Sequence, residues 1–180
     1  MGGGAAPVFA IVPTWNGGEL ALQCVRSLAA VESPPLRIAV IDNGSRDGTP
    51  DAIRAAAPGA QVVELGDNHG FTGAVNAGLA LAREAGAELA LLLNSDAVVA
   101  PEAIALLCEA LRLEPDAAAA GPTVYYADRP TVVWSAGGAL DWRRGATRML
   151  GIDEVDRGQF GERPRSVAFV TGCAMLLRLE

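Results

Sequence analysis

Two oxygen-bearing side chains, Asn94 and Asp96, stand directly after an unbroken apolar run over residues 89–93. A short continuous apolar run is typical of a strand that is buried on both faces of a sheet. In open α/β sheets, ligands bind at the carboxyl ends of the strands. A carboxylate at such an end suits a hard divalent cation, which prefers oxygen ligands. The alternative is a turn in which the side chain only hydrogen-bonds its own backbone.

Similar polar clusters follow two earlier apolar runs, where further strands are expected. The polar side chains in these clusters are Thr14, Asn16, Asp42, Asn43 and Ser45. Because consecutive strands of one sheet bring such ends to the same edge, we expect the clusters to lie together. An ionised carboxylate only accepts hydrogen bonds, so Asp42 suits the ring N–H of a uracil-type base. A bare Asx turn at Asp42 stays open as the alternative.

A fourth polar cluster, glycine-rich and spanning residues 66–73, leads into a helix. The N-terminus of a helix favours an anion such as phosphate, because its first N–H groups are free. Asn68 and Asn76 are equally typical of a loop and a helix cap. Together the four clusters suit a nucleotide that carries a diphosphate. A cation held by Asp96 would then bridge two phosphates and neutralise charge on a departing diphosphate.

The elements that position these clusters alternate along the chain. Strands are predicted over residues 8–12, 36–41, 60–65, 89–93 and 117–124, with a helix in each interval. The first helix should bury Leu20, Cys24, Val25, Leu28 and Val31, the third Val75, Leu79 and Ala82, and the fourth Ile104, Leu107, Cys108 and Leu111. Thr49 is expected to cap the second helix and Pro101 to open the fourth. This order predicts an α/β fold, a mostly parallel sheet with helices on both faces.

The last third of the chain has a different character. A strand with a glycine break is predicted over residues 132–138, and another strand over 167–177. Between them, residues 141–165 are polar and arginine-rich, and we expect a structureless loop that is mobile and closes over the ligand. Trp134 and Trp142 are expected to anchor packing or this loop, not to act as sugar platforms.

Composition excludes several classes of protein. The 180 residues are 51% hydrophobic, which suits one domain with a sizeable core. The net charge of −7 argues against general nucleic-acid binding, and the complete lack of lysine excludes a phosphate-loop or Schiff-base lysine. Three widely spaced cysteines, Cys24, Cys108 and Cys173, are expected to be buried reduced thiols. Without a secretory signal or an apolar stretch of ~20 residues, a cytoplasmic protein is expected; peripheral membrane association stays open.

Five segments resemble glycosyltransferase family 2, whose members have the GT-A fold. They span residues 11–16, 41–49, 68–78, 93–96 and 170–178, and the resemblance covers Val8 to Arg178. The most specific is Asp42-Asn43-Gly44-Ser45-Arg46-Asp47-Gly48-Thr49, which resembles the family's Asp-Asp/Asn-Gly-Ser-x-Asp-Gly-Thr segment. Gly137-Gly138 and the arginine-rich loop resemble the rhamnosyltransferase-like branch.

The resemblance implies a Rossmann-like GT-A fold and an inverting transfer of a hexosyl group. The donor would be a UDP- or dTDP-sugar, and the acceptor a hydroxyl of a glycan or lipid-linked molecule of the cell envelope. By this resemblance the base and ribose lie on Pro13, Thr14, Asp42 and Asn43, and the donor floor is Asn68, Gly70, Phe71 and Asn76. Asp96 would ligate Mg or Mn, with Asn94 on the ribose or on a metal-bound water.

The chain departs from the family pattern at two points. Asn94 stands where the family has the first aspartate of its Asp-x-Asp motif, and the general base is expected beyond Glu180. We therefore expect a fragment that is inactive alone, with a flexible tail over residues 1–7, a donor-binding α/β subdomain over 8–124 and an incomplete acceptor-side subdomain over 125–180. The alternatives are a non-catalytic nucleotide-sugar-binding module, and a sugar-nucleotide nucleotidylyltransferase, which would need a lysine in its first turn.

Overall fold

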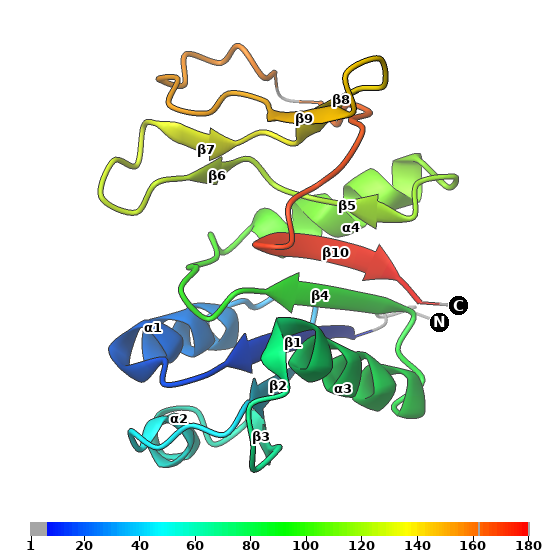
Figure 1. The fold of residues 1–180 in the computed structure, drawn as a ribbon. Coiled ribbons are helices and arrows are strands. Elements are labelled where there is room, and N and C mark those ends of the chain that lie inside the picture. The colour runs from blue at the N-terminus through cyan, green and yellow to red at the C-terminus, as the bar shows by residue number, and fades with distance from the viewer. Residues whose placement is uncertain (1–6, 162, 180) are drawn as a thin grey trace.

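One six-stranded sheet forms the centre of the molecule in the computed structural model, which describes residues 7–161 and 163–179. Its strands are β1 (Val8–Thr14), β2 (Leu36–Asp42), β3 (Gln61–Glu64), β4 (Leu89–Leu93), β5 (Ala119–Ala120) and β10 (Ala174–Arg178). They lie in the order β3-β2-β1-β4-β10-β5 (Figure 1). The first four are parallel, and β10 runs antiparallel to both of its neighbours. The predicted mostly parallel α/β sheet is confirmed.

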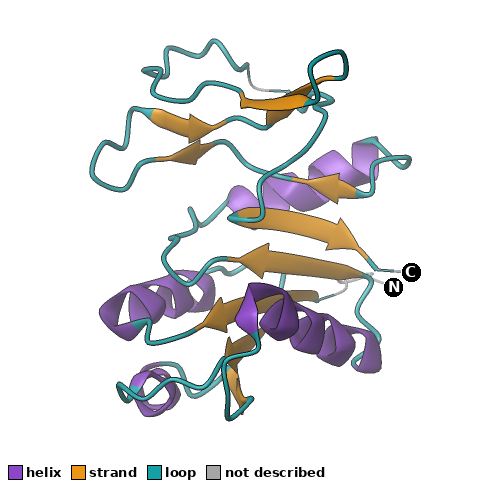
Figure 2. Ribbon diagram, viewed as in Figure 1, coloured by secondary structure: helices purple, strands orange, loops and turns teal. Residues whose placement is uncertain are grey.

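Helices cover both faces of this sheet, as Figure 2 shows. They are α1 (Gly18–Ala29), α2 (Thr49–Ala56), α3 (Gly70–Glu84) and α4 (Ala103–Leu113). Successive side chains of a strand point to opposite faces. In β1, Val8, Ala10 and Val12 pack with α1, α2 and α4, while Phe9 and Ile11 pack with α3. Burial on both faces explains why the strand reads as a continuous apolar run.

The contact between α3 and β1 is unusually close at Gly78. A Cβ atom placed on Gly78 would lie 2.3 Å from Ile11 Cγ2, so the helix backbone rests directly on the strand. The buried positions of α3 are Ala74, Gly78 and Ala82. Val75 and Leu79, which we predicted on the inward face together with Ala82, are only half-buried. Small residues therefore form the inner stripe of this helix.

Three predictions about the other helices are wrong. Thr49 lies inside α2, and Gly48, with φ +80°, occupies the cap position before it. Pro101 lies in a turn two residues before α4 begins. Leu20 is 56% exposed, because the inward face of α1 is formed by Ala21, Cys24, Val25 and Leu28.

The remaining strands form two small sheets outside the central one. They are β6 (Val124–Tyr125) with β7 (Val133–Ser135), and β8 (Gly138–Asp141) with β9 (Ala146–Met149). The strand predicted over 117–124 is broken into β5 and the start of β6 around Pro122, a residue that has no N–H for a ladder. The strand predicted over 167–177 begins only at Ala174. The predicted glycine break falls between β7 and β8, at Gly137 with φ +88°.

The segment over residues 141–165 is not structureless, contrary to prediction. It contains β9, which pairs with β8, and Val155 forms a bridge with Val132. The phenolic hydroxyl of Tyr125 also donates to Asp156. Its closure over a ligand stays a prediction.

The predicted division at residues 124/125 also stays a prediction, and β10 from the second part returns into the central sheet between β4 and β5. Residues 1–6 of the predicted tail lie outside the described residues, and Pro7 is exposed. The three cysteines are free, with Cys24 buried and the other two half-buried. Across residues 7–161 and 163–179, no helix is long and apolar enough to span a bilayer.

Candidate functional site

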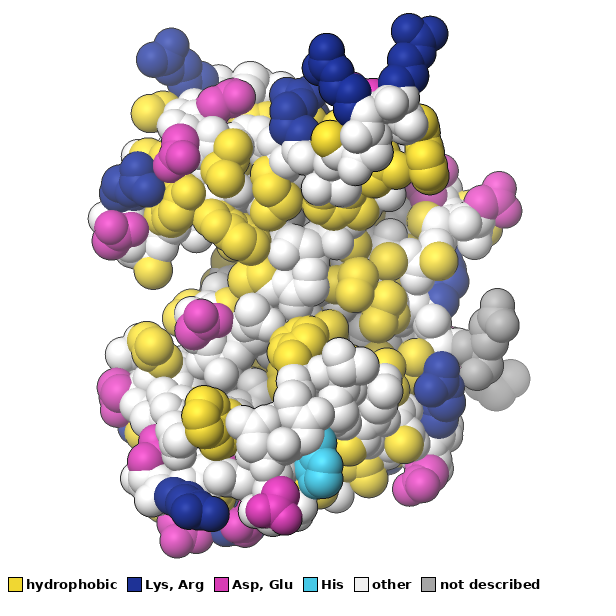
Figure 3. Space-filling model, viewed as in Figure 1, with side chains coloured by type: hydrophobic (Ala, Val, Ile, Leu, Met, Phe, Trp, Pro, Cys, Tyr) yellow, Lys and Arg dark blue, Asp and Glu magenta, His cyan; other side chains and the backbone are white. Residues whose placement is uncertain are grey.

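The candidate site lies where β1, β2 and β4 end. The chain passes from β1 outward to β2 and β3 and then returns to β4 on the other side of β1. Such a reversal of strand order opens a crevice at the carboxyl ends of the strands, where ligands bind in open α/β sheets. Thr14 and Asp42 are register partners, so β1 and β2 end side by side. Figure 3 shows an indentation on the side toward which β1 and β4 point in Figure 1.

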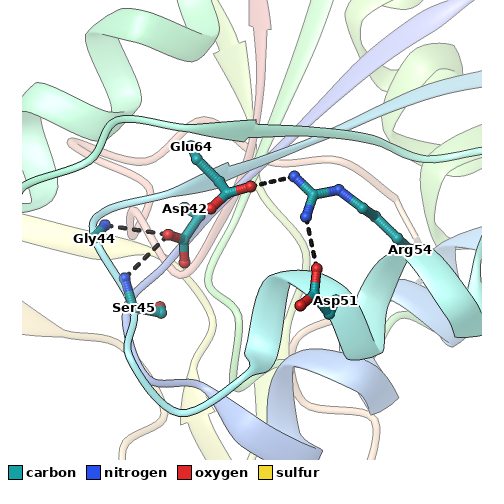
Figure 4. Close-up of polar contacts among 6 residues, drawn as sticks. All are labelled: Asp42, Gly44, Ser45, Asp51, Arg54 and Glu64. Carbon is teal, nitrogen blue, oxygen red and sulfur yellow. Dashed lines mark hydrogen bonds and ion pairs between the residues drawn. The ribbon is translucent and has the colours of Figure 1, made fainter.

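Asp42 is 1% exposed, and its two carboxylate oxygens have different surroundings. Oδ2 accepts hydrogen bonds from the backbone N–H groups of Gly44 (3.2 Å) and Ser45 (3.0 Å). Oδ1 is buried and has no hydrogen-bond partner within the described residues. Figure 4 shows that the neighbouring Arg54 instead pairs with Glu64 and Asp51. The Asx turn is therefore present, and it uses Oδ2 while Oδ1 remains without a partner within the described residues.

The turn after β1 is joined to the loop after β2. The Asn16 N–H donates to Ser45 Oγ (2.7 Å), and Asn16 Oδ1 accepts from the Arg46 N–H (2.9 Å). Asn16 has a left-handed φ of +50°, a conformation that Asn tolerates better than most residues. Asn16 and Ser45, both predicted site residues, thus hold the two loops together.

A second junction between these loops was missed by sequence reasoning. Thr49 Oγ1 accepts a hydrogen bond from the Gly18 N–H (2.9 Å) and donates one to Asp47 Oδ1 (2.6 Å). The hydrogen bonds that the hydroxyl and the backbone N–H of Thr49 donate to Asp47 lower the pKa of Asp47 below its ordinary value. The only signal for this junction in the sequence was that Asp47 and Thr49 lie within the specific segment 42–49.

Asn43 is buried and joins the end of β2 to the turn before α3. Its Nδ2 donates to Asn68 Oδ1 (3.0 Å) and to the Gly70 carbonyl (3.1 Å), and its Oδ1 accepts from the His69 N–H (2.9 Å). Asn68 Oδ1 also accepts from the Gly70 N–H (2.8 Å). The side chain of Asn43 is thereby engaged in placing the N-terminus of α3, a role that its position after a strand did not predict.

The N-terminus of α3 presents the remaining predicted donor-floor residues. Gly70, with φ +72°, begins the helix, and Phe71 is 52% exposed. Asn76 is exposed in the second turn of the helix. The first N–H groups of a helix have no partner within the helix, so this end offers donors to an anion.

The two predicted site residues within β1, Pro13 and Thr14, lie deeper in the molecule than the loops that follow the strands. Pro13 and Thr14 are buried, and the Thr14 carbonyl accepts from the Asn43 N–H (2.8 Å). Thr14 Oγ1 is buried without a partner within the described residues, but a Cβ on Gly17 would lie 2.5 Å from it. The hydroxyl therefore lies beneath the start of α1, and direct contact with a ligand would need that turn to move.

Asn94 and Asp96 follow β4 and differ in exposure. The Asn94 N–H donates to the Cys173 carbonyl (2.9 Å), and Asn94 Oδ1 is buried without a partner within the described residues. Asp96 is exposed.

Two cysteines lie close enough to Asp96 to be affected by its charge. Burial, followed by the charge of Asp96, raises the pKa of Cys24 to about 12 and raises the pKa of Cys173. Both thiols are therefore protonated at neutral pH and do not act as thiolate ligands.

The donor set fits a hard cation that is only partly held by protein. Among the described residues, no three metal-ligating side chains come together. Asp96 is the single carboxylate in residues 94–100, which follow β4. Mg²⁺ is commonly bound by one or two carboxylates together with waters and substrate phosphates. An exposed Asp96 just after the end of β4 fits that description.

Comparison with known proteins defines the class. Residues 9–178 match the model of the family "Glycosyl transferase family 2", so the chain belongs to this family. The predicted resemblance is thus confirmed. Among curated proteins, N-acetylglucosaminyl-diphospho-decaprenol L-rhamnosyltransferases of two Mycobacterium tuberculosis strains are 31% identical over 126 residues, 66% of this chain. The chain spans only 40% of the length of these relatives.

Solved structures give the same fold. The mannosyltransferase PcManGT of Pyrobaculum calidifontis, in complex with GDP-Man and Mn²⁺, is 29% identical, with a TM-score of 0.56 over 63% of this chain and 34% of that one. S. aureus TarS in complex with UDP-GlcNAc is 21% identical, with a TM-score of 0.55 over 67% of this chain and 37% of that one. At that identity the TarS likeness supports the GT-A fold alone.

Proposed function

We propose that this chain is the donor-binding part of an inverting glycosyltransferase that uses a UDP- or dTDP-sugar. The observation that carries the proposal is Asp42 Oδ1, a buried carboxylate oxygen without a partner within the described residues. Leaving a buried acceptor unpaired costs about 1–3 kcal/mol, and more for a charged group. The ring N–H of uracil or thymine would donate to this oxygen and recover that loss, while Oδ2 keeps its bonds to the loop.

The diphosphate would lie between the N-terminus of α3 and Asp96. The free N–H groups of α3 would donate to phosphate oxygens, and Asn94 Oδ1 would accept from a ribose hydroxyl or a metal-bound water. Asp96 would ligate Mg²⁺ or Mn²⁺, which when bound neutralises negative charge on the departing nucleoside diphosphate. Support comes from the mannosyltransferase neighbour, whose structure holds a nucleotide sugar together with Mn²⁺.

Transfer itself requires groups beyond those assigned to the donor. An acceptor hydroxyl must lose its proton to a base within about 2.6–3.2 Å, or through one water, as it attacks the anomeric carbon. Asp42 holds the β2–α2 loop and Asp96 is assigned to the cation, so neither is proposed as the base. Because the chain spans only 40% of the length of its rhamnosyltransferase relatives, we propose that the base lies outside residues 1–180. The named acceptor of the rhamnosyltransferase relatives is lipid-linked, which supports a lipid-linked or glycan hydroxyl here. A cytoplasmic location, at the inner face of a membrane, stays a prediction.

Two alternative functions differ in their support. A non-catalytic nucleotide-sugar-binding module would show the same donor site, and a transfer assay on the longer protein separates it from an enzyme. A nucleotidylyltransferase has no support, because the chain contains no lysine and its family is a glycosyltransferase family.

A thermal-shift panel of UDP, dTDP and GDP, each with and without Mn²⁺, tests the proposal. A ligand at 100-fold its dissociation constant should raise the free energy of unfolding by about 2.7 kcal/mol. We expect stabilisation by UDP or dTDP that increases with Mn²⁺. Stabilisation by GDP alone would contradict the proposed uracil or thymine nucleobase but still support a nucleotide site. No response to any nucleotide would contradict the site itself.

A further inference from the structure

The β8–β9 hairpin has an exposed surface that folding does not explain. Every residue from Asp141 to Arg148 is exposed, and Trp142 in the turn is 86% exposed, the highest value among the large apolar side chains of the described residues. The prediction that Trp142 anchors packing is therefore wrong. Figure 1 shows β8 and β9 at the end of the molecule opposite β3.

The same turn concentrates positive charge. Arg143, Arg144 and Arg148 lie within the seven residues 142–148, which contain no carboxylate, in a chain whose net charge is −7. Arg144 lies 3.8 Å from Asp141, and the other two have no ion pair within the described residues. Asp141 Oδ1 also accepts from the N–H groups of Arg143 (3.0 Å) and Arg144 (3.2 Å), which fixes the turn. Figure 3 shows arginine side chains, in dark blue, projecting from this end of the molecule.

We propose that this hairpin tip, defined as residues 142–148, docks on a bilayer surface that carries anionic lipids. The amphipathic ring of tryptophan is enriched at membrane–water interfaces, and guanidinium groups bind lipid phosphates in a bidentate manner. Approach by the tip places the α/β part at the far end of the molecule from the lipid. Repulsion between its carboxylates and the anionic surface is then weakened, because the Debye length is about 8 Å at physiological salt.

An extended polyanion such as nucleic acid fits this surface less well. Affinity for nucleic acid depends on many phosphate contacts, each made by a basic side chain. Three arginines at one turn supply few such contacts, and the acidic remainder of the chain would repel a long polymer. The proposal does not depend on the proposed function, since vesicle binding and nucleotide binding are measured separately.

Flotation of the 180-residue chain with vesicles provides the test. We expect binding to phosphatidylcholine vesicles that contain about 30% phosphatidylserine, weaker binding as salt rises, and no binding to pure phosphatidylcholine. Each arginine near such a surface contributes about five-fold to partitioning, so R143Q/R144Q/R148Q should bind on the order of 100-fold more weakly. W142A should also bind more weakly, whereas W142F and R143K/R144K/R148K should retain binding.

The control is R26Q/R37Q/R83Q, which removes three exposed arginines from the α/β part and changes the net charge equally. Equal loss in this control, retained binding by R143Q/R144Q/R148Q, or no binding by the unaltered chain would overturn the proposal. Stronger binding to single-stranded DNA than to the vesicles, lost with the same three arginines, would assign the surface to polyanions instead. All altered side chains are exposed, so unchanged melting temperatures are expected throughout.

Discussion

At the scale of single residues, the two oxygens of Asp42 have different proposed roles. Oδ2 holds the loop after β2, and Oδ1 is proposed to accept from the nucleobase. In D42N the amide oxygen can still accept from the N–H groups of Gly44 and Ser45, while the NH₂ group faces the ligand. The NH₂ group of the new side chain and the ring N–H of the nucleobase, both hydrogen-bond donors, would then face each other. We expect D42N to weaken UDP or dTDP binding by about 1–3 kcal/mol with little loss of stability, measured by calorimetry. D51N, which changes an exposed carboxylate of the same region, should bind the nucleotide normally. If D42N also bound normally, Asp42 would have no role in binding and would only form the Asx turn.

Asp96 carries the second prediction at this scale. Because it is the single carboxylate at the end of β4, D96N should abolish the part of nucleoside diphosphate binding that depends on Mn²⁺ and preserve the fold. Titrations with and without Mn²⁺ measure this difference. D116N, in an exposed loop remote from the strand ends, should keep the full effect of the metal. A D96N protein that responds to Mn²⁺ as strongly as the unaltered chain would remove Asp96 from the site.

At the scale of elements, Thr49 joins α1 to the β2–α2 loop. T49V leaves the Gly18 N–H without its acceptor and should lower the free energy of unfolding by about 1–3 kcal/mol, whereas T131V at an exposed position should change little. The pKa of Asp47 is lowered in the folded state, so its ionised form adds stability above its unfolded pKa of about 4. This stability is lost as pH falls through the lower folded value. T49V should show a smaller acid dependence in denaturant titrations; an identical pH profile would contradict the junction.

The packing of α3 on β1 gives a second prediction for elements. In G78A the new methyl group would lie 2.3 Å from Ile11 Cγ2, so the helix or the strand must shift. Overpacking of this kind typically costs about 1–3 kcal/mol. G59A is the matched control, because a Cβ there meets nothing within 4 Å. Denaturant midpoints measure both changes, and a G78A protein as stable as G59A would show that α3 is not seated as described.

At the scale of the whole molecule, donor binding and transfer should be separable. Residues 1–180 contain the donor clusters, while the base is placed outside them, and losing general-base assistance costs about 10²–10⁴-fold in rate. We expect this chain to bind nucleoside diphosphate and metal yet transfer sugar negligibly. A longer protein that continues past residue 180 should restore acceptor-dependent release of nucleoside diphosphate. Robust turnover by the 180-residue chain would show that the base lies within it.

The sequence predicted the ends of the strands better than the contacts between loops. Apolar runs that stop abruptly at polar residues located Asp42 and Asn94, because burial on both faces leaves a continuous pattern. The bonds of Asn43 to the turn before α3 join residues 25 to 27 positions apart, and no periodicity encodes them. The β8–β9 hairpin was missed because β9, most of which is exposed, lacks apolar alternation.

The position of β10 has a consequence for the order in which the molecule folds. β10 pairs with β4, and the register partners Ala174 and Leu93 are separated by some 80 residues of chain. During synthesis from the N-terminus, β4 would therefore remain an unpaired edge until residue 178 has left the ribosome. Non-local strand pairing is slow, and an apolar edge without a partner invites association with other chains. A ribosome-stalled chain ending near residue 130 should thus be more prone to aggregation than one ending after β10, and chaperones should bind it more strongly.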